Sequence, residues 1–321
     1  MPISIKEARA IVAYAQSRFL ERHYFTFERK HLLATLEKKI ADQMTKFEGG
    51  VFVRLTGMSP KDGLPLTPDG KSLYDLFSEA THSIADVNQK AIVIARLQMQ
   101  LLKCTSARHV MNLLLTSERA EKELLEAIEH NSPVNLIFRR WEGALRDDLE
   151  FRVFVHERRI VAISQYNHYC CFDVLAGMDE AMRCRLRDKI IEYVGRLLDR
   201  IEPPSYVMDV ALIEEKNVPL IEGRLVTIEL NPFLETTGAA LFDWKQDSDL
   251  LHGRMPVEKP EFRIHRQPIL NIGDFVTCVF SDLESKKRDE CYVGAYNEYY
   301  DTLVQCFAEK NSSQHQGCCI C

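Results

Sequence analysis

The alternation of apolar and polar residues along 226–233 predicts a strand that carries an acidic side chain. The stretch reads VTIELNPF. Because side chains alternate between the two faces of a strand, Thr227, Glu229 and Asn231 should share one face. Pro232 cannot donate a hydrogen bond to a sheet, so the strand should end there. A carboxylate in so apolar a strand needs a compensating partner, and Mg²⁺ is one candidate. The alternative is an ordinary half-exposed strand with a polar face.

A second strand with one acid is predicted upstream, at 206–212, which reads YVMDVAL. Asp209 and Glu229 are equally far along the chain from Pro219, so a hairpin that turns there brings both carboxylates together. Two carboxylates that close repel each other unless a proton or a cation lies between them. Asp, Glu and Asn at one end of a sheet suit a nucleotide–Mg²⁺ site. The alternative is a solvent-facing Asp on an edge strand.

The remaining pattern predicts a mixture of helices and strands. Apolar residues at helical spacing predict helices at 3–19, 31–46, 71–88, 105–130, 178–200 and 289–310. Short apolar runs bounded by turn residues predict strands at 51–55, 134–141, 150–155, 160–165, 262–269 and 275–280. Residues 91–101 are apolar and fit either a strand or a helix.

Length and composition restrict the class of protein. A chain of 321 residues is long enough for two or three packed subdomains. With 46% hydrophobic and 27% charged residues, wholesale disorder is excluded. The net charge of −6 argues against a dedicated, nonspecific nucleic-acid binder. No apolar run approaches the ~20 residues of a membrane span, and the first residues lack a signal-peptide pattern. We therefore expect a cytoplasmic protein with mostly free thiols.

Two regions carry cations that suit phosphate. Arg54 belongs to the strand at 51–55, and the loop TGMSPKDG after it contains Lys61 and Asp62. Together they fit a phosphate clamp, or simply a charged surface turn. Arg152 shares a strand face with Phe154, and an interior Arg there would need an anionic partner such as phosphate.

The stretches that contain these residues resemble the cell division cycle protein 123 family, whose members adopt an ATP-grasp fold. The resemblance rests on five motifs in order: VFVRLTGMSPKD, LIFRRW, EFRVFVHERRIVAISQYNHYC, YVMDV, and TIELNPF followed by LFDW. It implies an α+β fold in which two subdomains bind ATP–Mg²⁺ between them. We expect the first subdomain, with the N-terminal helices, at 1–130, the second at 131–310, and a flexible Cys-rich tail at 311–321.

The resemblance also implies the residues of the nucleotide site. These are Arg54, Lys61, Asp62, Arg139, Arg140, Trp141, Arg152, Asp209, Glu229 and Asn231. Arg54 takes the place of a phosphate-contacting lysine, and the segment 139–141 matches the border of the adenine. Asp209, Glu229 and Asn231 match the Mg²⁺ ligands. Glu229 replaces an aspartate common in the family, and Leu234 stands where Gly is usual.

By resemblance, the leading functional hypothesis is an assembly factor for translation initiation factor 2 that binds its gamma subunit. ATP–Mg²⁺ would shape the binding surface without being consumed. The alternative is an ATP-grasp ligase that activates a carboxylate or a nucleic-acid end. A ligase needs an acceptor pocket beside the γ-phosphate, and the sequence does not identify one. A third hypothesis is a scaffold that has lost nucleotide, and the three oxygen ligands weigh against it.

The chain ends in CCIC, which fits a prenylation box with Cys318 as the acceptor. No polybasic run precedes the box, so one lipid would give only weak membrane association. The alternative is a cysteine-rich end that matches by chance.

Overall fold

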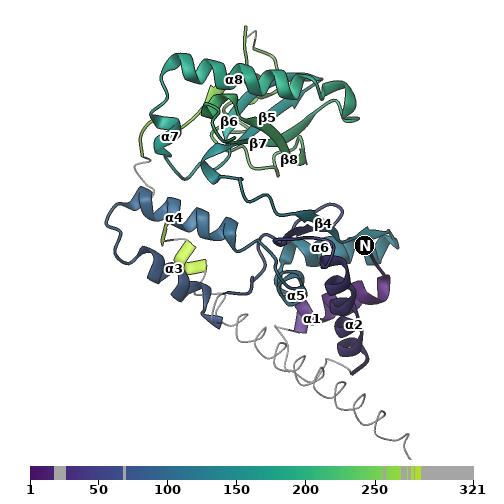
Figure 1. The fold of residues 1–321 in the computed structure, drawn as a ribbon. Coiled ribbons are helices and arrows are strands. Elements are labelled where there is room, and N and C mark those ends of the chain that lie inside the picture. Colours follow the sequence, from purple (N-terminus) through teal and green to yellow (C-terminus); the bar gives the residue numbers. More distant parts are fainter. Residues whose placement is uncertain are drawn as a thin grey trace, which may run out of the picture. The chain divides into compact units, whose positions relative to one another are not determined.

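The computed structural model describes residues 1–17, 27–67, 70–255, 258–268, 273, 276–277 and 279–282. The predicted helix at 289–310 and the tail with Cys318 lie outside these residues. The chain forms two compact units that interleave along the sequence (Figure 1). The first unit comprises Met1–Ala80, Leu97–Trp141 and Val279–Cys321, and the second comprises Thr81–Arg96 and Glu142–Cys278.

The first unit is a helical cluster with two small sheets. Its helices are α1 (Ile5–Ser17), α2 (Phe27–Met44), α3 (Leu73–Thr81, whose last residue is assigned to the second unit), α5 (Ala107–Thr116) and α6 (Glu118–His130). Strand β1 (Pro2–Ile3) pairs with β3 (Val134–Asn135), and β2 (Val51–Arg54) pairs with β4 (Ile137–Arg140), both antiparallel. Apolar residues of α1, α2, α5, α6 and these strands form one buried core. In the part of the chain that the structure describes, no helix is long and apolar enough to cross a membrane.

The single helix predicted at 105–130 is wrong, because the chain forms two helices there. Ser117 separates α5 from α6 and adopts an extended backbone conformation. Its hydroxyl oxygen accepts a hydrogen bond from the backbone N–H of Ala120 and caps the start of α6. The apolar spacing continues across the break, so periodicity alone does not reveal it.

Two further predictions are settled by the structure. Helix α4 (Val87–Gln100) shows that the ambiguous stretch 91–101 is mainly helical. The strand predicted at 275–280 is wrong, because residues 276–277 and 279–280 are helical. Apolar runs this short fit a helix or a strand equally well.

The second unit is built around a five-stranded sheet in the order β8-β7-β5-β6-β9. Its strands are β5 (Glu150–His156), β6 (Arg159–Gln165), β7 (Tyr206–Ile213), β8 (Arg224–Pro232) and β9 (Glu261–Arg263). Only the β6–β9 pair of this sheet is parallel. Its helices include most of α4 (Val87–Gln100), α7 (Asp173–Ala176), α8 (Glu180–Gly195) and α9 (Ser248–Leu251), with short 3₁₀ turns at Asp147–Leu149, Leu198–Arg200 and Leu220–Glu222.

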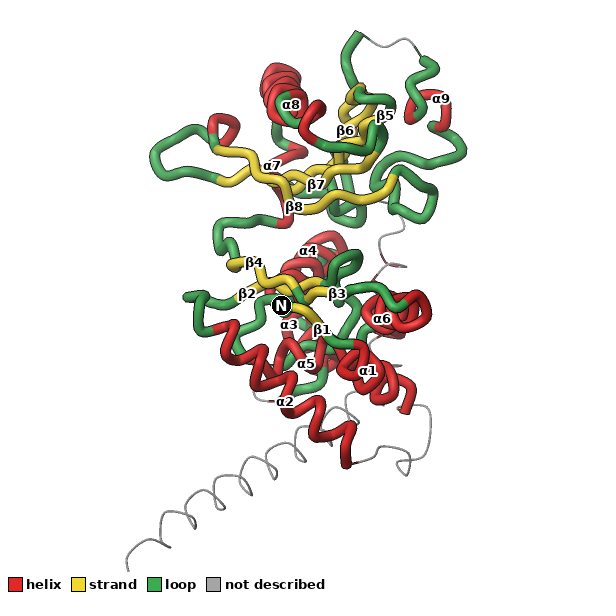
Figure 2. Tube along the Cα trace, turned by 90° about the vertical axis from the view of Figure 1, so that its right-hand side faces the viewer, coloured by secondary structure: helices red, strands yellow, loops and turns green. Residues whose placement is uncertain are grey.

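The two faces of this sheet differ in character. Helix α8 lies along one face in both views (Figures 1 and 2), where its apolar side chains pack on those of β5 and β7. On the opposite face, Phe154 and Val207 pack against Phe242 and the apolar residues of α9. The same face carries Arg152 and Asp209. We call it the Arg152 face, and it presents the candidate site.

Acidification should destabilise the first unit through His109. This residue lies on α5 and is 5% exposed, and its Nε2 has no hydrogen-bond partner within the described ranges of the chain. Burial lowers the pKa of His109 to about 4, and a backbone hydrogen bond with Leu101 opposes the shift only partly. The unfolded chain, with an ordinary His pKa near 6.5, binds the proton first as the pH falls. Stability is therefore complete above the unfolded pKa and is lost as the pH falls toward the folded pKa.

Urea unfolding at several pH values measures this effect. Between about pH 7 and about pH 5, the wild type should lose about 2 kcal/mol more than a His109→Phe variant. The matched control is His130→Gln, which removes an exposed histidine of the next helix. An equal pH dependence in wild type and His109→Phe would contradict the prediction.

Candidate functional site

The hairpin of β7 and β8 brings the two predicted acids together. Asp209 is directly opposite Glu229 in the ladder, and Val207 is opposite Asn231. Strand β8 ends at Pro232, as its missing N–H predicts. The prediction that a hairpin places Asp209 beside Glu229 is therefore confirmed.

A β-bulge changes one part of the predicted alternation. The register shifts between Asp209 and Val210, so that Val210 is opposite Thr227 and Ile228 is the extra residue. Thr227 consequently faces α8, where its Oγ1 lies 3.0 Å from the hydroxyl of Tyr193. The prediction that Thr227 shares a face with Glu229 is wrong, because the extra residue reverses the alternation.

The centre of the Arg152 face is a buried ion pair. Arg152 donates from Nε and Nη2 to the two carboxylate oxygens of Asp209, both at 2.8 Å. The side chains are 10% and 1% exposed. Asn231 donates from Nδ2 to Asp209 Oδ2 at 3.0 Å, and Arg152 Nη1 donates to the Gly238 carbonyl. The guanidinium carbon also lies 4.9 Å from the centre of the Tyr166 ring. The anionic partner that an interior Arg152 requires is thus Asp209.

The charge of Asp209 raises the pKa of Arg152. Burial alone would lower the pKa of Arg152, but the hydrogen bonds and the negative charge of Asp209 outweigh burial and raise it. A bidentate guanidinium–carboxylate contact in a dry environment fixes both side chains in one geometry.

The chemical type of the available ligands suits a hard divalent cation, which prefers oxygen. Carboxylate and amide oxygens lie at neighbouring positions of one sheet face, on Asp209, Glu229 and Asn231. Arg152 already supplies positive charge to Asp209. A cation bound to that carboxylate would therefore share its oxygen atoms with Arg152. Among the residues that the structure describes, no group of three or more His, Cys, Asp or Glu side chains is arranged to hold a metal.

The residues predicted around the phosphates and the adenine lie on β2, β4 and the loop after β2. Phe52 is opposite Arg139 and Val51 is opposite Arg140 in this ladder, and both arginines are exposed. The half-buried Arg54 donates from Nη2 to the Gly57 carbonyl at 2.8 Å. That contact ties its guanidinium to its own loop.

Two more of these predicted residues have structural contacts. Asp62 accepts hydrogen bonds from the Ser117 hydroxyl at 2.6 Å and from the Arg119 backbone N–H at 3.2 Å. It therefore fixes the loop to the start of α6. Lys61 Nζ lies 6.0 Å from the ring centre of Phe52.

The backbone N–H of Trp141 donates to the Gly50 carbonyl at 3.1 Å, which extends the pairing of β2 and β4. The predicted residues divide between the two units. Arg54, Lys61, Asp62, Arg139, Arg140 and Trp141 belong to the first unit, and Arg152, Asp209, Glu229 and Asn231 belong to the second. The structure gathers the second set on one face of one sheet.

Sequence reasoning missed several residues that organise these regions. Glu123 on α6 accepts hydrogen bonds from the backbone N–H groups of Gly57 and Met58, at 2.8 and 2.6 Å. Glu123 belongs to a charged helical stretch, so nothing in its spacing distinguishes it from a solvated residue. Gly238, whose carbonyl binds Arg152, likewise has no sequence signal.

Comparisons with known proteins agree on one family. The family model described as D123 matches residues 91–273. The "Translation initiation factor eIF2 assembly protein" of Vanderwaltozyma polyspora is 25% identical over 249 residues, which cover 75% of this chain and 56% of that protein. The protein of the same name from Aspergillus niger is 32% identical over 155 residues, covering 46% and 38%. The chain thus spans about half the length, or less, of these curated relatives.

A solved structure is also similar. The structure of Cdc123 from Schizosaccharomyces pombe aligns with a TM-score of 0.50 and 23% identity, and the alignment covers 78% of this chain and 84% of that chain. At this identity the likeness concerns the fold, a mixed α+β architecture.

Proposed function

The chain belongs to the D123 family, and from this premise we propose that it assists the assembly of translation initiation factor 2 (eIF2). The observation that carries the proposal is the match of the family model to residues 91–273, because relatives that match this chain are named eIF2 assembly proteins. We further propose the gamma subunit as the direct partner, an ATP-grasp fold and a cytoplasmic location. These finer points follow from the resemblance of the ordered motifs.

We propose that the Arg152 face binds ATP–Mg²⁺. Asp209, Glu229 and Asn231 would hold the metal ion, which supplies positive charge to the phosphates when bound. Arg152 would exchange one of its bonds to Asp209 for a phosphate oxygen, because a guanidinium binds both anions in the same bidentate way. From the same resemblance we propose nucleotide contacts for a second set of residues, all in the first unit: Arg54, Lys61, Asp62, Arg139, Arg140 and Trp141.

Calorimetric titration of ATP into the full chain, with and without Mg²⁺, tests the nucleotide proposal. Replacing Asp209 with asparagine keeps the shape of the side chain but removes the charge that attracts the cation. We expect Mg²⁺-dependent binding in the wild type and a loss of at least about tenfold in affinity for Asp209→Asn. The control is Asp188→Asn, a change of the same chemistry at a side chain that is 46% exposed. Equal affinities of wild type and Asp209→Asn would contradict the proposed site.

Capture of the purified gamma subunit by the immobilised chain tests the assembly role. Stable capture that strengthens with ATP–Mg²⁺ supports an assembly factor whose surface is shaped by nucleotide. ATP turnover without capture would contradict that role and would favour a ligase. Repeating the capture with Asp209→Asn separates loss of nucleotide from loss of partner binding.

A further inference from the structure

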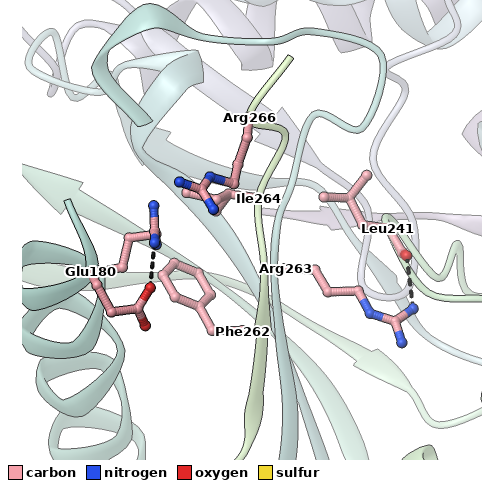
Figure 3. A pocket seen from close by; sticks show the side chains of 7 residues that line it. Glu180, Leu241, Phe262, Arg263, Ile264 and Arg266 are labelled. Carbon is pink, nitrogen blue, oxygen red and sulfur yellow. Dashed lines mark hydrogen bonds and ion pairs between the residues drawn. The ribbon is translucent and has the colours of Figure 1, made fainter. Parts of the chain in front are cut away.

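The second unit contains an arginine-rich pocket of about 460 Å³ that lies at the β9 edge of the sheet. Figure 3 shows the side chains that line it. They are Glu180, Arg183, Leu241, Phe262, Arg263, Ile264 and Arg266. None of them belongs to the proposed nucleotide site, and three are permanently positive guanidinium groups.

Arg263 already has carboxylate partners and serves the fold. It donates from Nη1 and Nη2 to the two carboxylate oxygens of Asp247, both at 2.8 Å, and from Nε to Glu261 at 2.6 Å. Its guanidinium carbon also lies 4.1 Å from the centre of the Phe242 ring. These contacts hold the Arg263 side chain in place at the side of the pocket and use most of its N–H donors.

Arg266 is different, because it forms no hydrogen bond or ion pair with any residue in the described part of the chain. It is exposed and follows β9. In Figure 3 its guanidinium extends over the pocket, toward the side on which Glu180 lies. Its five N–H donors are therefore available to a ligand.

Arg183 supplies the second guanidinium group of the pocket, and it is paired with the exposed carboxylate of Glu180. Its side chain is 12% exposed and is held by a 2.8 Å hydrogen bond from Nη1 to the Met178 carbonyl. Nη2 donates to Glu180, whose side chain is 77% exposed. An exposed carboxylate of this kind is weakly held and exchanges readily with a competing anion.

We propose that this pocket binds the phosphate group of a phosphorylated peptide between Arg266 and Arg183. A single carboxylate from a ligand would merely replace Glu180, which competes as part of the same chain. A phosphate monoester carries nearly two negative charges and three acceptor oxygens. It therefore gains bonds to Arg266 while it displaces Glu180 from Arg183.

The position of the pocket favours a peptide as the carrier of the phosphate. Among the residues that the structure describes, β9 is the last strand of the sheet and pairs only with β6. An edge strand offers backbone N–H and C=O groups along which an extended peptide pairs. The exposure of Arg266 and Glu180 leaves the phosphate-binding groups open to a peptide in that position.

The test is a fluorescence anisotropy titration of the full chain with a short labelled peptide of valine and threonine that has phosphoserine at its centre. Matched peptides carry serine or glutamate at that position. We expect the phosphoserine peptide to bind at least about tenfold more tightly than the glutamate peptide. Arg266→Gln should remove that advantage, whereas Glu180→Gln should strengthen binding by up to about fivefold, because it removes the competitor.

Arg196→Gln is the matched control, since Arg196 is an exposed arginine at the other end of α8, paired with Glu192. It should leave binding unchanged. Equal binding of the phosphoserine and glutamate peptides, or no effect of Arg266→Gln in a folded protein, would overturn the proposal. Free phosphoserine that competes at the same concentration as the peptide would overturn the peptide part. No ATP-site residue is altered, so these results are independent of the nucleotide titration.

Discussion

Replacing Arg152 with methionine should lower the free energy of unfolding of the second unit by about 3–5 kcal/mol. The substitution removes the guanidinium that satisfies both oxygens of Asp209, a side chain that is only 1% exposed. A carboxylate that keeps its charge in that environment loses its strongest partner without regaining water. The attachment of the Gly238 carbonyl to the sheet is lost at the same time.

Tryptophan fluorescence can measure the loss of unfolding free energy in the second unit separately from the first. The chain has two tryptophans, Trp141 in the first unit and Trp244 in the second. In a Trp141→Phe background, urea unfolding followed at Trp244 reports on the sheet that carries Arg152. An Arg152→Met change in that background should shift the midpoint strongly toward lower urea.

Arg196→Met is the matched control, because this arginine forms an exposed pair with Glu192. It should cost less than about 1 kcal/mol. A double variant that also replaces Asp209 with leucine should recover much of the stability lost in Arg152→Met, since no buried charge remains. Similar losses for Arg152→Met and Arg196→Met would show that the pair is not the main support of this face.

The β7–β8 hairpin could be predicted because the residues that determine it are close together in the sequence. Each strand carries a clear apolar pattern, and a polar turn with Pro219 separates them, so their pairing follows from the sequence. The bulge at Ile228 could not be predicted, because alternation assumes one residue of β8 for each residue of β7. For this reason the sequence also predicted the wrong sheet face for Thr227.

Contacts between distant residues account for most of what the sequence did not reveal. Arg152 and Asp209 are 57 positions apart, and each is a single charge in an apolar strand. The sequence indicated that an interior Arg152 would need an anionic partner, with phosphate as a candidate, but it did not identify Asp209 as that partner. The break at Ser117 was hidden for a related reason, since its hydroxyl serves both the α6 cap and Asp62.

The family was identifiable because it rests on several motifs in a fixed order rather than on one site. The family model confirms that resemblance over residues 91–273. The mixed α+β architecture is also confirmed, by the similarity to the solved Cdc123 structure. The nucleotide and metal roles of the individual residues remain predictions, since they depend on ligands and not on the fold.

Replacing Phe154 with alanine should lower the free energy of unfolding of the second unit by about 3–5 kcal/mol. Phe154 is fully buried on the Arg152 face. Its ring contacts Phe242 and Trp244 edge to face, with centroid distances of 5.5 and 5.7 Å. Alanine would leave a cavity and remove both aromatic contacts.

The change should also appear in the folded state. Trp244 donates from its indole N–H to the Thr237 carbonyl at 2.6 Å, in the same loop whose Gly238 carbonyl binds Arg152. With Phe154 gone, Trp244 loses a packing partner, and its emission in the Trp141→Phe background should shift to longer wavelength before any unfolding.

Two further variants separate packing from a general loss of apolar surface. Phe154→Leu keeps most of the buried volume and should cost less than Phe154→Ala. Leu234→Ala changes a side chain that is 57% exposed in the same loop and should cost less than about 0.5 kcal/mol.

If Phe154→Ala were no more destabilising than Leu234→Ala, the aromatic cluster would not hold the loop against the sheet. Arg152 would then be its main attachment, and the losses from Arg152→Met and Phe154→Ala would differ sharply. If instead both substitutions give large losses that are not additive in the double variant, the ion pair and the aromatic cluster hold the loop as one unit.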